Sequence, residues 1–289
     1  MYGLKELNFT LPSNTISIDT IAKEINLDKE TLQNIKNGGL KTIPFCNDIY
    51  ALIEKSLLKI DLTDIKGVIY ASSVDFEIKH DVDIEFCKIG GEPCAILHLA
   101  LKLAQNWAKK VNGDILVIGV DKPLSLNKRV YFNSVNGDIV ITAIISNKNI
   151  RHQIISSYTD SYIFADNGEK SNQNDITKFR ENNPLLIREH IYTNLKKANL
   201  DLNDIKYIFP HTPYTQIWDI MAKILDYPRE RIWTNYIEET GHLNSNDSFY
   251  HYLKAIDEKI VKKDDVVLLL NNSFGGSRGS TILKYKGKN

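Results

Sequence analysis

The chain contains an internal repeat, which limits its possible folds more than any other feature of the sequence. Residues 61–66 (DLTDIK) precede the apolar run 67–71, and residues 201–206 (DLNDIK) precede a second such run at 207–211. A segment with apolar residues at every fourth position, typical of one helical face, comes before each copy. Each copy therefore predicts a helix, a polar turn and a buried strand. The alternative is a chance match of six residues, because short similar segments recur in many α/β proteins.

The similarity between the two copies continues along the chain. We predict helices over 94–110 and 248–262, each followed by an apolar strand, at 114–119 and 265–270. Unbroken apolar runs are typical of strands covered on both faces, and alternating strands and helices favour a mainly parallel sheet. The sequence thus predicts an α/β fold of two related halves, residues 1–150 and 151–289. The polar stretch 160–174 is predicted to be an exposed loop.

Composition and charge exclude several classes of function. Lys+Arg and Asp+Glu are equal at 36 each, so no bulk field favours nucleic acid or an anionic membrane. The apolar run 266–270 is too short to span a bilayer, and residues 1–9 do not resemble a signal peptide. The three cysteines form no CxxC pair, so we expect reduced thiols in the cytoplasm and no metal site. A local basic patch for an acidic carrier protein stays compatible with zero net charge.

The first candidate site residue is Cys94. In parallel α/β sheets, sites gather at the carboxyl ends of strands and the amino ends of helices. The segment 90–95 (GGEPCA) opens a predicted helix, where free N–H groups and the helix dipole favour the nucleophilic thiolate. The alternative is a buried structural cysteine. Cys46 and Cys87 have no such context and are expected to be structural.

Two segments of the second half place polar residues at the corresponding edge. His211 ends a predicted strand between two prolines, where it could be a general base or a donor to a thioester carbonyl oxygen. The alternative is a histidine in a surface turn. Downstream, Asn246 and Asp247 lie just before a predicted helix, as ordinary N-caps or as partners of His211.

A glycine pair follows the last predicted strand. Gly275 and Gly276 could bring backbone N–H groups close to a ligand, as an oxyanion hole requires, or could form a tight hairpin. The segment lacks the Gly-Lys-Ser/Thr of a P-loop, and no GxGxxG follows an early strand. Nucleotide hydrolysis and dinucleotide binding are therefore poorly supported.

The order Cys, His, Asn/Asp, Gly-Gly resembles the β-ketoacyl-acyl carrier protein synthase III family of the thiolase superfamily. The segments that carry this resemblance are 13–23, 93–104, 117–121, 209–211 and 274–280. The resemblance implies a thiolase-like five-layer αβαβα fold of two pseudo-repeated halves, usually a homodimer. It also implies that Cys94 accepts an acyl group from a coenzyme A or carrier-protein thioester. His211 and a partner would then assist transfer to an acceptor, with no bound cofactor and with Gly275 and Gly276 at the oxyanion loop.

The resemblance leaves the third catalytic residue open. The synthases use Asn, and a gap-free count back from 255–258 reaches Asn246. Gly241-His242 with Asp247 instead resembles a branch of these proteins with a Cys-His-Asp set. We favour Asp247, since an Asp could orient a histidine as a base toward an acceptor. An Asn would suit the enolate left by decarboxylation.

Two departures from the family narrow the predicted function. The segment 32–40 contains neither Trp nor Arg, which the family uses to clamp coenzyme A, so carrier-protein delivery is favoured. The segment 73–94 is short, where the family forms part of its dimer contact and acyl tunnel. We therefore predict a pathway-specific acyltransferase. The alternatives are a catalytically reduced partner subunit of a heteromeric condensing enzyme and a thioester hydrolase that uses Cys94 and His211.

Overall fold

A large mixed sheet forms the centre of the computed structural model, which describes residues 2–74, 77–78, 83–90, 94–131, 133–162, 171–213, 215–274 and 276–287. Its nine strands lie in the order β11-β12-β13-β10-β1-β9-β6-β4-β5. In chain order they are β1 (Gly3–Thr10), β4 (Ile65–Ala71), β5 (Phe86–Ile89), β6 (Asp114–Asp121), β9 (Ile139–Ser146), β10 (His152–Ser161), β11 (Tyr207–Pro210), β12 (Val266–Asn272) and β13 (Ser277–Tyr285). Two small two-stranded sheets pair β2 (Thr15–Ser17) with β3 (Thr42–Pro44) and β7 (Val130–Tyr131) with β8 (Ser134–Val135).

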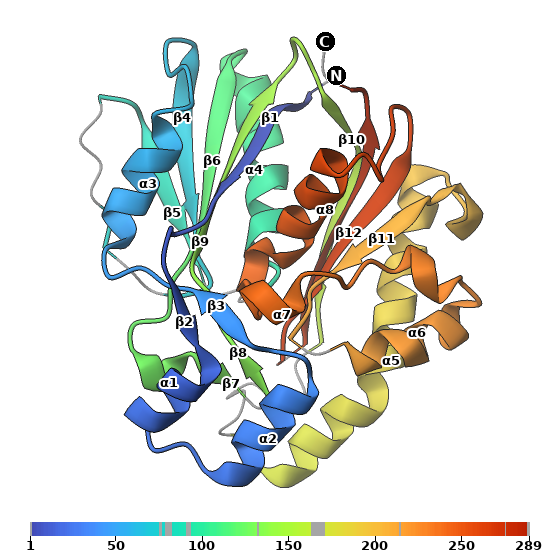
Figure 1. The fold of residues 1–289 in the computed structure, drawn as a ribbon. Coiled ribbons are helices and arrows are strands. Elements are labelled where there is room, and N and C mark those ends of the chain that lie inside the picture. The colour runs from blue at the N-terminus through green and yellow to red at the C-terminus, as the bar shows by residue number, and fades with distance from the viewer. Residues whose placement is uncertain are drawn as a thin grey trace.

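The helices connect and cover these strands (Figure 1). They are α1 (Ile18–Glu24), α2 (Lys29–Asn37), α3 (Ile49–Leu57), α4 (Ile96–Val111), α5 (Gln173–Ala198), α6 (Gln216–Leu225), α7 (Ile237–Thr240) and α8 (Asp247–Asp257). Short 3₁₀ turns lie at η1 (Leu126–Lys128), η3 (Leu202–Asp204), η4 (Arg229–Arg231) and η5 (Asn244–Asn246). Within the described part of the chain, no helix is both long and apolar enough to cross a membrane.

Helices and sheet alternate in five layers, as predicted. Residues of α4 and α8 share one apolar cluster with the inner faces of both parts of the sheet. Helix α3 covers the outer face of β4, β6 and β9, while α5 and α6 cover the outer face of β11, β12 and β13. The order is therefore α3, sheet, α4 with α8, sheet, α5 with α6, which is the thiolase-like αβαβα arrangement (Figure 1).

The strand directions correct one expectation from the sequence. Only β4 with β5, β4 with β6, and β11 with β12 pair in parallel among the described strands; β1, β9, β10 and β13 pair antiparallel with their neighbours. The prediction of a mainly parallel sheet was wrong. The cause is that helices bury both faces of the sheet, so an antiparallel strand such as β9 is as continuously apolar as a parallel one.

The predicted boundary at residue 150 falls between β9 and β10. The strands before it lie on one side of the sheet and those after it on the other, and β1 meets β10 at Leu4 and His152. The division into two separate halves stays a prediction, since the strands form one continuous sheet. In the predicted loop 160–174, residues 163–170 lie outside the described residues, and Asp160 belongs to β10.

The repeated helix and strand pairs are present with small shifts in their ends. The helix predicted over 94–110 is α4, and the strand after it, β6, continues to Asp121. The helix predicted over 248–262 is α8, which begins at Asp247 and already ends at Asp257. It stops there because Lys259 adopts φ +61°, a left-handed conformation that a helix cannot continue through.

Candidate active site

Cys94 lies in the turn that leads into α4, directly before the residue that caps this helix. Among the described residues, no side chain caps the helix start, so its first N–H groups have no capping partner there. The Sγ atom of Cys94 is 3.7 Å from Nε2 of His242. The residues 91–93 that precede it lie outside the described part. Burial and the nearby Asp138 raise the pKa of the Cys46 thiol to about 12, and burial raises that of Cys87. Cys94 is therefore the thiol suited to nucleophilic chemistry.

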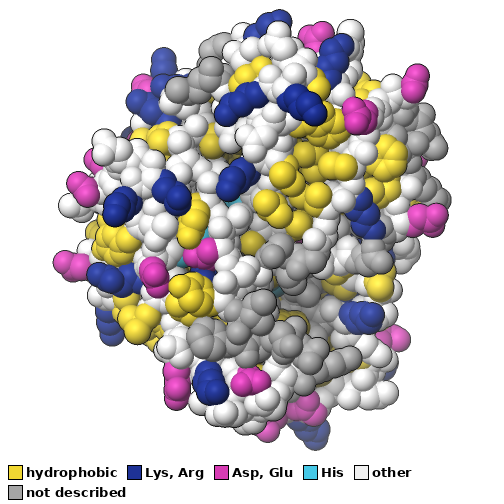
Figure 2. Space-filling view, turned by 180° about the vertical axis from the view of Figure 1, so that it is seen from behind, with side chains coloured by type: hydrophobic (Ala, Val, Ile, Leu, Met, Phe, Trp, Pro, Cys, Tyr) yellow, Lys and Arg dark blue, Asp and Glu magenta, His cyan; other side chains and the backbone are white. Residues whose placement is uncertain are grey.

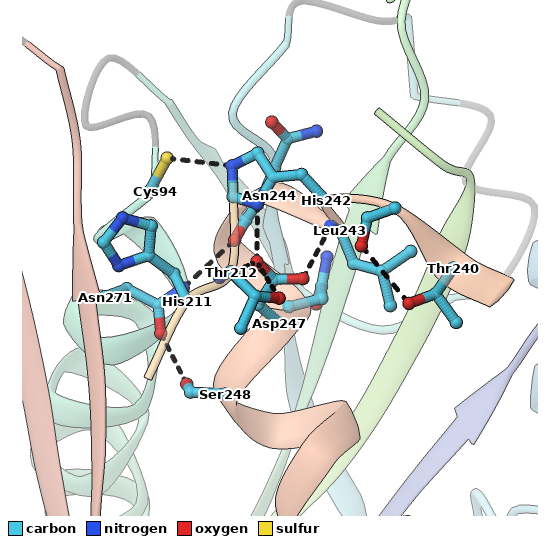
Figure 3. A network of polar contacts seen from close by, with 12 residues as sticks. Cys94, His211, Thr212, Thr240, His242, Leu243, Asn244, Asp247, Ser248 and Asn271 are labelled. Carbon is cyan, nitrogen blue, oxygen red and sulfur yellow. Dashed lines mark hydrogen bonds and ion pairs between the residues drawn. The ribbon is translucent and has the colours of Figure 1, made fainter. Parts of the chain in front are cut away.

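His242 joins Cys94 to a buried carboxylate. Its Nδ1 atom lies 2.5 Å from Oδ2 of Asp247, and its Nε2 atom faces Cys94 (Figure 3). Asp247 is itself fixed, because Oδ2 accepts the backbone N–H of Thr212 at 2.7 Å and Oδ1 accepts that of Leu243 at 2.6 Å. The Asp247 side chain is fully buried. Cys94, His242 and Asp247 thus form a continuous row in which the carboxylate fixes the orientation of the imidazole.

Electrostatics make His242 and Asp247 an ion pair at neutral pH. Burial by itself would lower the pKa of His242, but the charge and hydrogen bond of Asp247, together with Cys94, raise it to about 10. Burial would raise the pKa of Asp247, but the His242 cation holds it below its ordinary value. An imidazolium facing a cysteine stabilises the thiolate, which is the reactive form.

His211 lies beside this row at the carboxyl end of β11. Its ring centroid is 5.9 Å from that of His242. Its Nδ1 atom accepts the backbone N–H of Asn272 at 3.2 Å, and its carbonyl accepts the indole N–H of Trp218. Burial lowers the pKa of His211 to about 3, so its ring is neutral and carries its proton on Nε2. Of the two roles open from the sequence, this geometry favours the hydrogen-bond donor over the base.

The structure separates the two candidates for the third residue. Asp247 contacts a histidine, but it is His242 rather than the predicted partner His211. Asn246 points elsewhere: its amide donates to Oδ2 of Asp121 at 2.7 Å. Its Oδ1 atom lies only 2.6 Å from where a Cβ on Gly119 would be, so this side chain packs against β6. Asp247 is therefore part of the site geometry, while Asn246 serves the contact between the sheet and the loop.

Of the predicted glycine pair, the structure describes Gly276. Gly275 lies outside the described residues. Gly276 adopts φ +105°, its N–H donates to the carbonyl of Ser273 at 3.2 Å, and its carbonyl accepts the N–H of Tyr162. The N–H of Gly276 is therefore used inside the turn, which is the hairpin alternative rather than an oxyanion hole.

His242 is the residue whose role the sequence reasoning missed. From the sequence, Gly241-His242 with Asp247 indicated only a resemblance to one branch of the family, and no role was predicted for His242 itself. Its signal is the spacing of five positions across a 3₁₀ turn, η5, which lets the two side chains meet. Among the described residues, no group of three or more His, Cys, Asp or Glu side chains could hold a metal ion.

Comparisons with known proteins agree with this fold. Residues 195–285 match the family model of the 3-oxoacyl-[acyl-carrier-protein (ACP)] synthase III C-terminal region. The β-ketoacyl-[acyl-carrier-protein] synthase III of Fusobacterium nucleatum is 28% identical over 133 residues, which are 42% of this chain and 40% of that protein. The chain thus spans about two fifths of the length of this curated relative.

Solved structures resemble the chain over its whole length. The 3-oxoacyl-[acyl-carrier-protein] synthase III of Aquifex aeolicus superposes with a TM-score of 0.78 at 18% identity, covering 99% of this chain and 100% of that one. ChlB3, an acyltransferase, superposes with a TM-score of 0.80 at 14% identity, covering 99% and 98%. The chain therefore has the fold of these proteins, which is thiolase-like. Over part of its length, the sequence is similar to β-ketoacyl-[acyl-carrier-protein] synthases III.

Proposed function

We propose that the chain is an acyltransferase that carries the acyl group on Cys94 and passes it to an oxygen or nitrogen acceptor. The observation that supports this most directly is the row Cys94–His242–Asp247. A thiol, a histidine and a buried carboxylate in this order are what nucleophilic catalysis with a general base requires.

In the first step, the thiolate of Cys94 attacks the carbonyl carbon of an acyl thioester. The tetrahedral oxygen accepts the Nε2–H of neutral His211, and the intermediate collapses when the C–S bond to the donor breaks. The imidazolium of His242 gives its Nε2 proton to the departing thiolate. The products are an acyl thioester on Cys94, a free donor thiol and a neutral His242 that keeps its Nδ1–H on Asp247.

In the second step, neutral His242 accepts the proton of an acceptor hydroxyl or amine as that group attacks the acyl carbon. His211 again donates to the carbonyl oxygen. When the bond to Sγ breaks, Cys94 leaves as a thiolate facing the imidazolium of His242. The starting ion pair is restored, so protons balance over the cycle without another group.

Two observations favour this reaction over decarboxylative carbon–carbon condensation. The amide of Asn246, which would suit a thioester enolate, is bound to Asp121. The base His242 with its carboxylate stands in contact with Cys94 instead.

We propose a phosphopantetheinyl carrier-protein or coenzyme A thioester as the donor and a homodimer as the working form. The absence of Trp and Arg over 32–40 favours the carrier protein. For the dimer, Phe86 on the edge strand β5 is 45% exposed, and hydrophobic side chains gather on the upper part of the back face (Figure 2). Light scattering would test the homodimer directly.

Thioester hydrolysis is a second candidate, because the same row of residues could activate water instead of an acceptor. Release of free acid at the rate of donor consumption, unaffected by added alcohols or amines, would favour it. The third reading, a catalytically reduced partner subunit, is less well supported. That alternative was suggested by the missing coenzyme A clamp over 32–40 and the short segment 73–94. Cys94, His242 and Asp247, however, lie together in this one chain.

The first experiment is the mass of the intact protein after incubation with a panel of acyl-coenzyme A and acyl-carrier-protein thioesters. We expect the preferred donor to add one acyl mass to the wild type and nothing to Cys94→Ala, since this small change costs little packing. Donors that label both proteins equally, or neither, would rule out an acyl-enzyme on Cys94.

A further inference from the structure

Asp121 ends β6 and is fully buried, yet no cation is bonded to it among the described residues. Its Oδ1 atom accepts the backbone N–H of Ser73 at 3.0 Å and the hydroxyl of the same residue. Its Oδ2 atom accepts the N–H of Ser245 at 3.0 Å, the hydroxyl of Ser245 at 2.6 Å and the amide of Asn246 at 2.7 Å. A buried carboxylate in an apolar sheet is costly unless such donors satisfy it.

These donors come from two distant parts of the chain. Ser73 follows β4 in the first part of the sheet. Ser245 and Asn246 lie in η5, the short turn between His242 and Asp247. Asp121 therefore ties the sheet that supports the Cys94 helix to the loop that carries the acid–base pair. The mechanism proposed above does not use this carboxylate.

The conformation of the η5 loop depends on its hydrogen bonds to Asp121. Asn244 adopts φ +50°, which is uncommon for a residue other than glycine and needs support from its surroundings. The support comes from two sides: the amide of Asn271 donates to the carbonyl of Asn244 at 3.0 Å, and Asp121 holds the next two residues. With an amide at 121, a single oxygen would remain for donors that now share two, so some buried donors would lose their acceptor.

We propose that Asp121 is a positioning residue that holds the η5 loop so that His242 reaches Cys94. This inference rests on His242 being the partner of Cys94 in the proposed function, but not on the identity of donor or acceptor. Contact between the two residues needs only a small displacement of the loop to be lost, because Nε2 and Sγ are already 3.7 Å apart. A misplacement of about 1 Å at a reacting pair can cost on the order of 100-fold in rate.

The test is the rate at which iodoacetamide alkylates Cys94, read by intact mass and peptide mapping across pH 6–9. This reaction needs the thiolate but no acyl donor. We compare the wild type with Asp121→Asn, Ser245→Ala and His242→Asn. The matched control is Asp114→Asn, which changes a buried carboxylate at the other end of the same strand, paired with Lys5.

We expect Asp121→Asn to slow alkylation at pH 7 by roughly tenfold or more and to steepen its dependence on pH, as in His242→Asn. Ser245→Ala, which removes one of the donors, is expected to fall between Asp121→Asn and the wild type. Asp114→Asn should react like the wild type. A purely structural role would lower the melting temperature of the Asp121 variant without changing the reactivity of Cys94 in the folded protein.

The outcomes separate the two proposals. If His242→Asn slows alkylation and a folded Asp121→Asn does not, the positioning role of Asp121 is wrong while the role of His242 stands. If neither variant slows it, His242 is not the partner of Cys94 and the proposed function fails first. If Asp121→Asn does not fold, Ser245→Ala decides, and a wild-type rate in that variant overturns the inference.

Discussion

The Nδ1 atom of His242 lies 2.5 Å from Oδ2 of Asp247, across a turn that separates the two residues by five positions. This contact commits the buried carboxylate to His242 and leaves His211 with no carboxylate partner among the described residues. The two histidines therefore differ in charge: His242 is cationic at neutral pH, and His211 is neutral. We assign the proton transfers to His242 and the binding of the thioester oxygen to His211.

Replacing Asp247 by Asn should slow acylation of Cys94 by about 10²- to 10⁴-fold. An amide cannot supply the charge that raises the pKa of His242, so the imidazole would be largely neutral at pH 7. Stopped-flow or quenched mass spectrometry under single-turnover conditions measures this rate. Because removal of one partner of a buried ion pair can cost about 3–5 kcal/mol of stability, the variant is assayed below its melting temperature. Asp265→Asn, which changes a half-buried carboxylate in the turn before β12, serves as the control. A rate within twofold of wild type in Asp247→Asn would contradict the prediction.

Replacing His211 by Phe should reduce acyl transfer by about 10²- to 10³-fold, the usual effect of removing one oxyanion donor. Alkylation of Cys94 by iodoacetamide forms no oxyanion, so its rate should change little. The ratio of the two rates distinguishes this role from that of His242, whose loss should slow both reactions. Equal losses in both assays for His211→Phe would show that His211 acts on the thiolate instead.

The stability of the protein should depend on pH through His242. Its pKa of about 10 in the folded state is above the ordinary value of 6.5, so the native state binds this proton more tightly than the unfolded chain. The resulting stabilisation is fully present below pH 6.5 and is lost as the pH rises through about 10. Between pH 7 and 10, calorimetry should therefore show a steeper fall in melting temperature for the wild type than for His242→Asn. Parallel curves would mean that His242 is not strongly coupled to Asp247.

Replacing Gly119 by Ala should destabilise the protein by about 1–3 kcal/mol, the usual cost of overpacking. The new Cβ would lie 2.6 Å from Oδ1 of Asn246 and 3.2 Å from a methyl of Leu97. Asn246 cannot move away easily, because Asp121 holds its amide. Denaturant unfolding of Gly119→Ala, Asn246→Ala and the double variant measures the coupling.

The three variants form a double-mutant cycle, and we expect the coupling free energy between Gly119 and Asn246 to have a definite sign. The cost of Gly119→Ala should be smaller in the Asn246→Ala background, although the contact with Leu97 keeps part of it. If Gly119→Ala lowers the free energy of unfolding equally in both backgrounds, the Asn246 side chain does not pack against β6.

Features that depend on local pattern could be read from the sequence. Apolar residues at every fourth position predicted α3, and the repeat predicted α4 with β6 and α8 with β12. The placement of Cys94 at a helix start also followed from its own neighbours. Helix periodicity and turn chemistry involve residues a few positions apart, so a single sequence records them directly.

Only the tertiary structure decided the strand directions and the partners of the polar side chains. A strand buried on both faces has the same apolar pattern in a parallel and an antiparallel pair, so the direction of β9 was invisible. Cys94 meets His242 across 148 positions of chain, and Asn246 turns to Asp121 across 125. The sequence by itself predicted that a cysteine, one histidine and an Asp or Asn side chain would gather at one edge of an α/β sheet. Which histidine faces the sulfur depends on packing between distant segments, because hydrogen-bond partners are chosen by position in space and not by order in the chain.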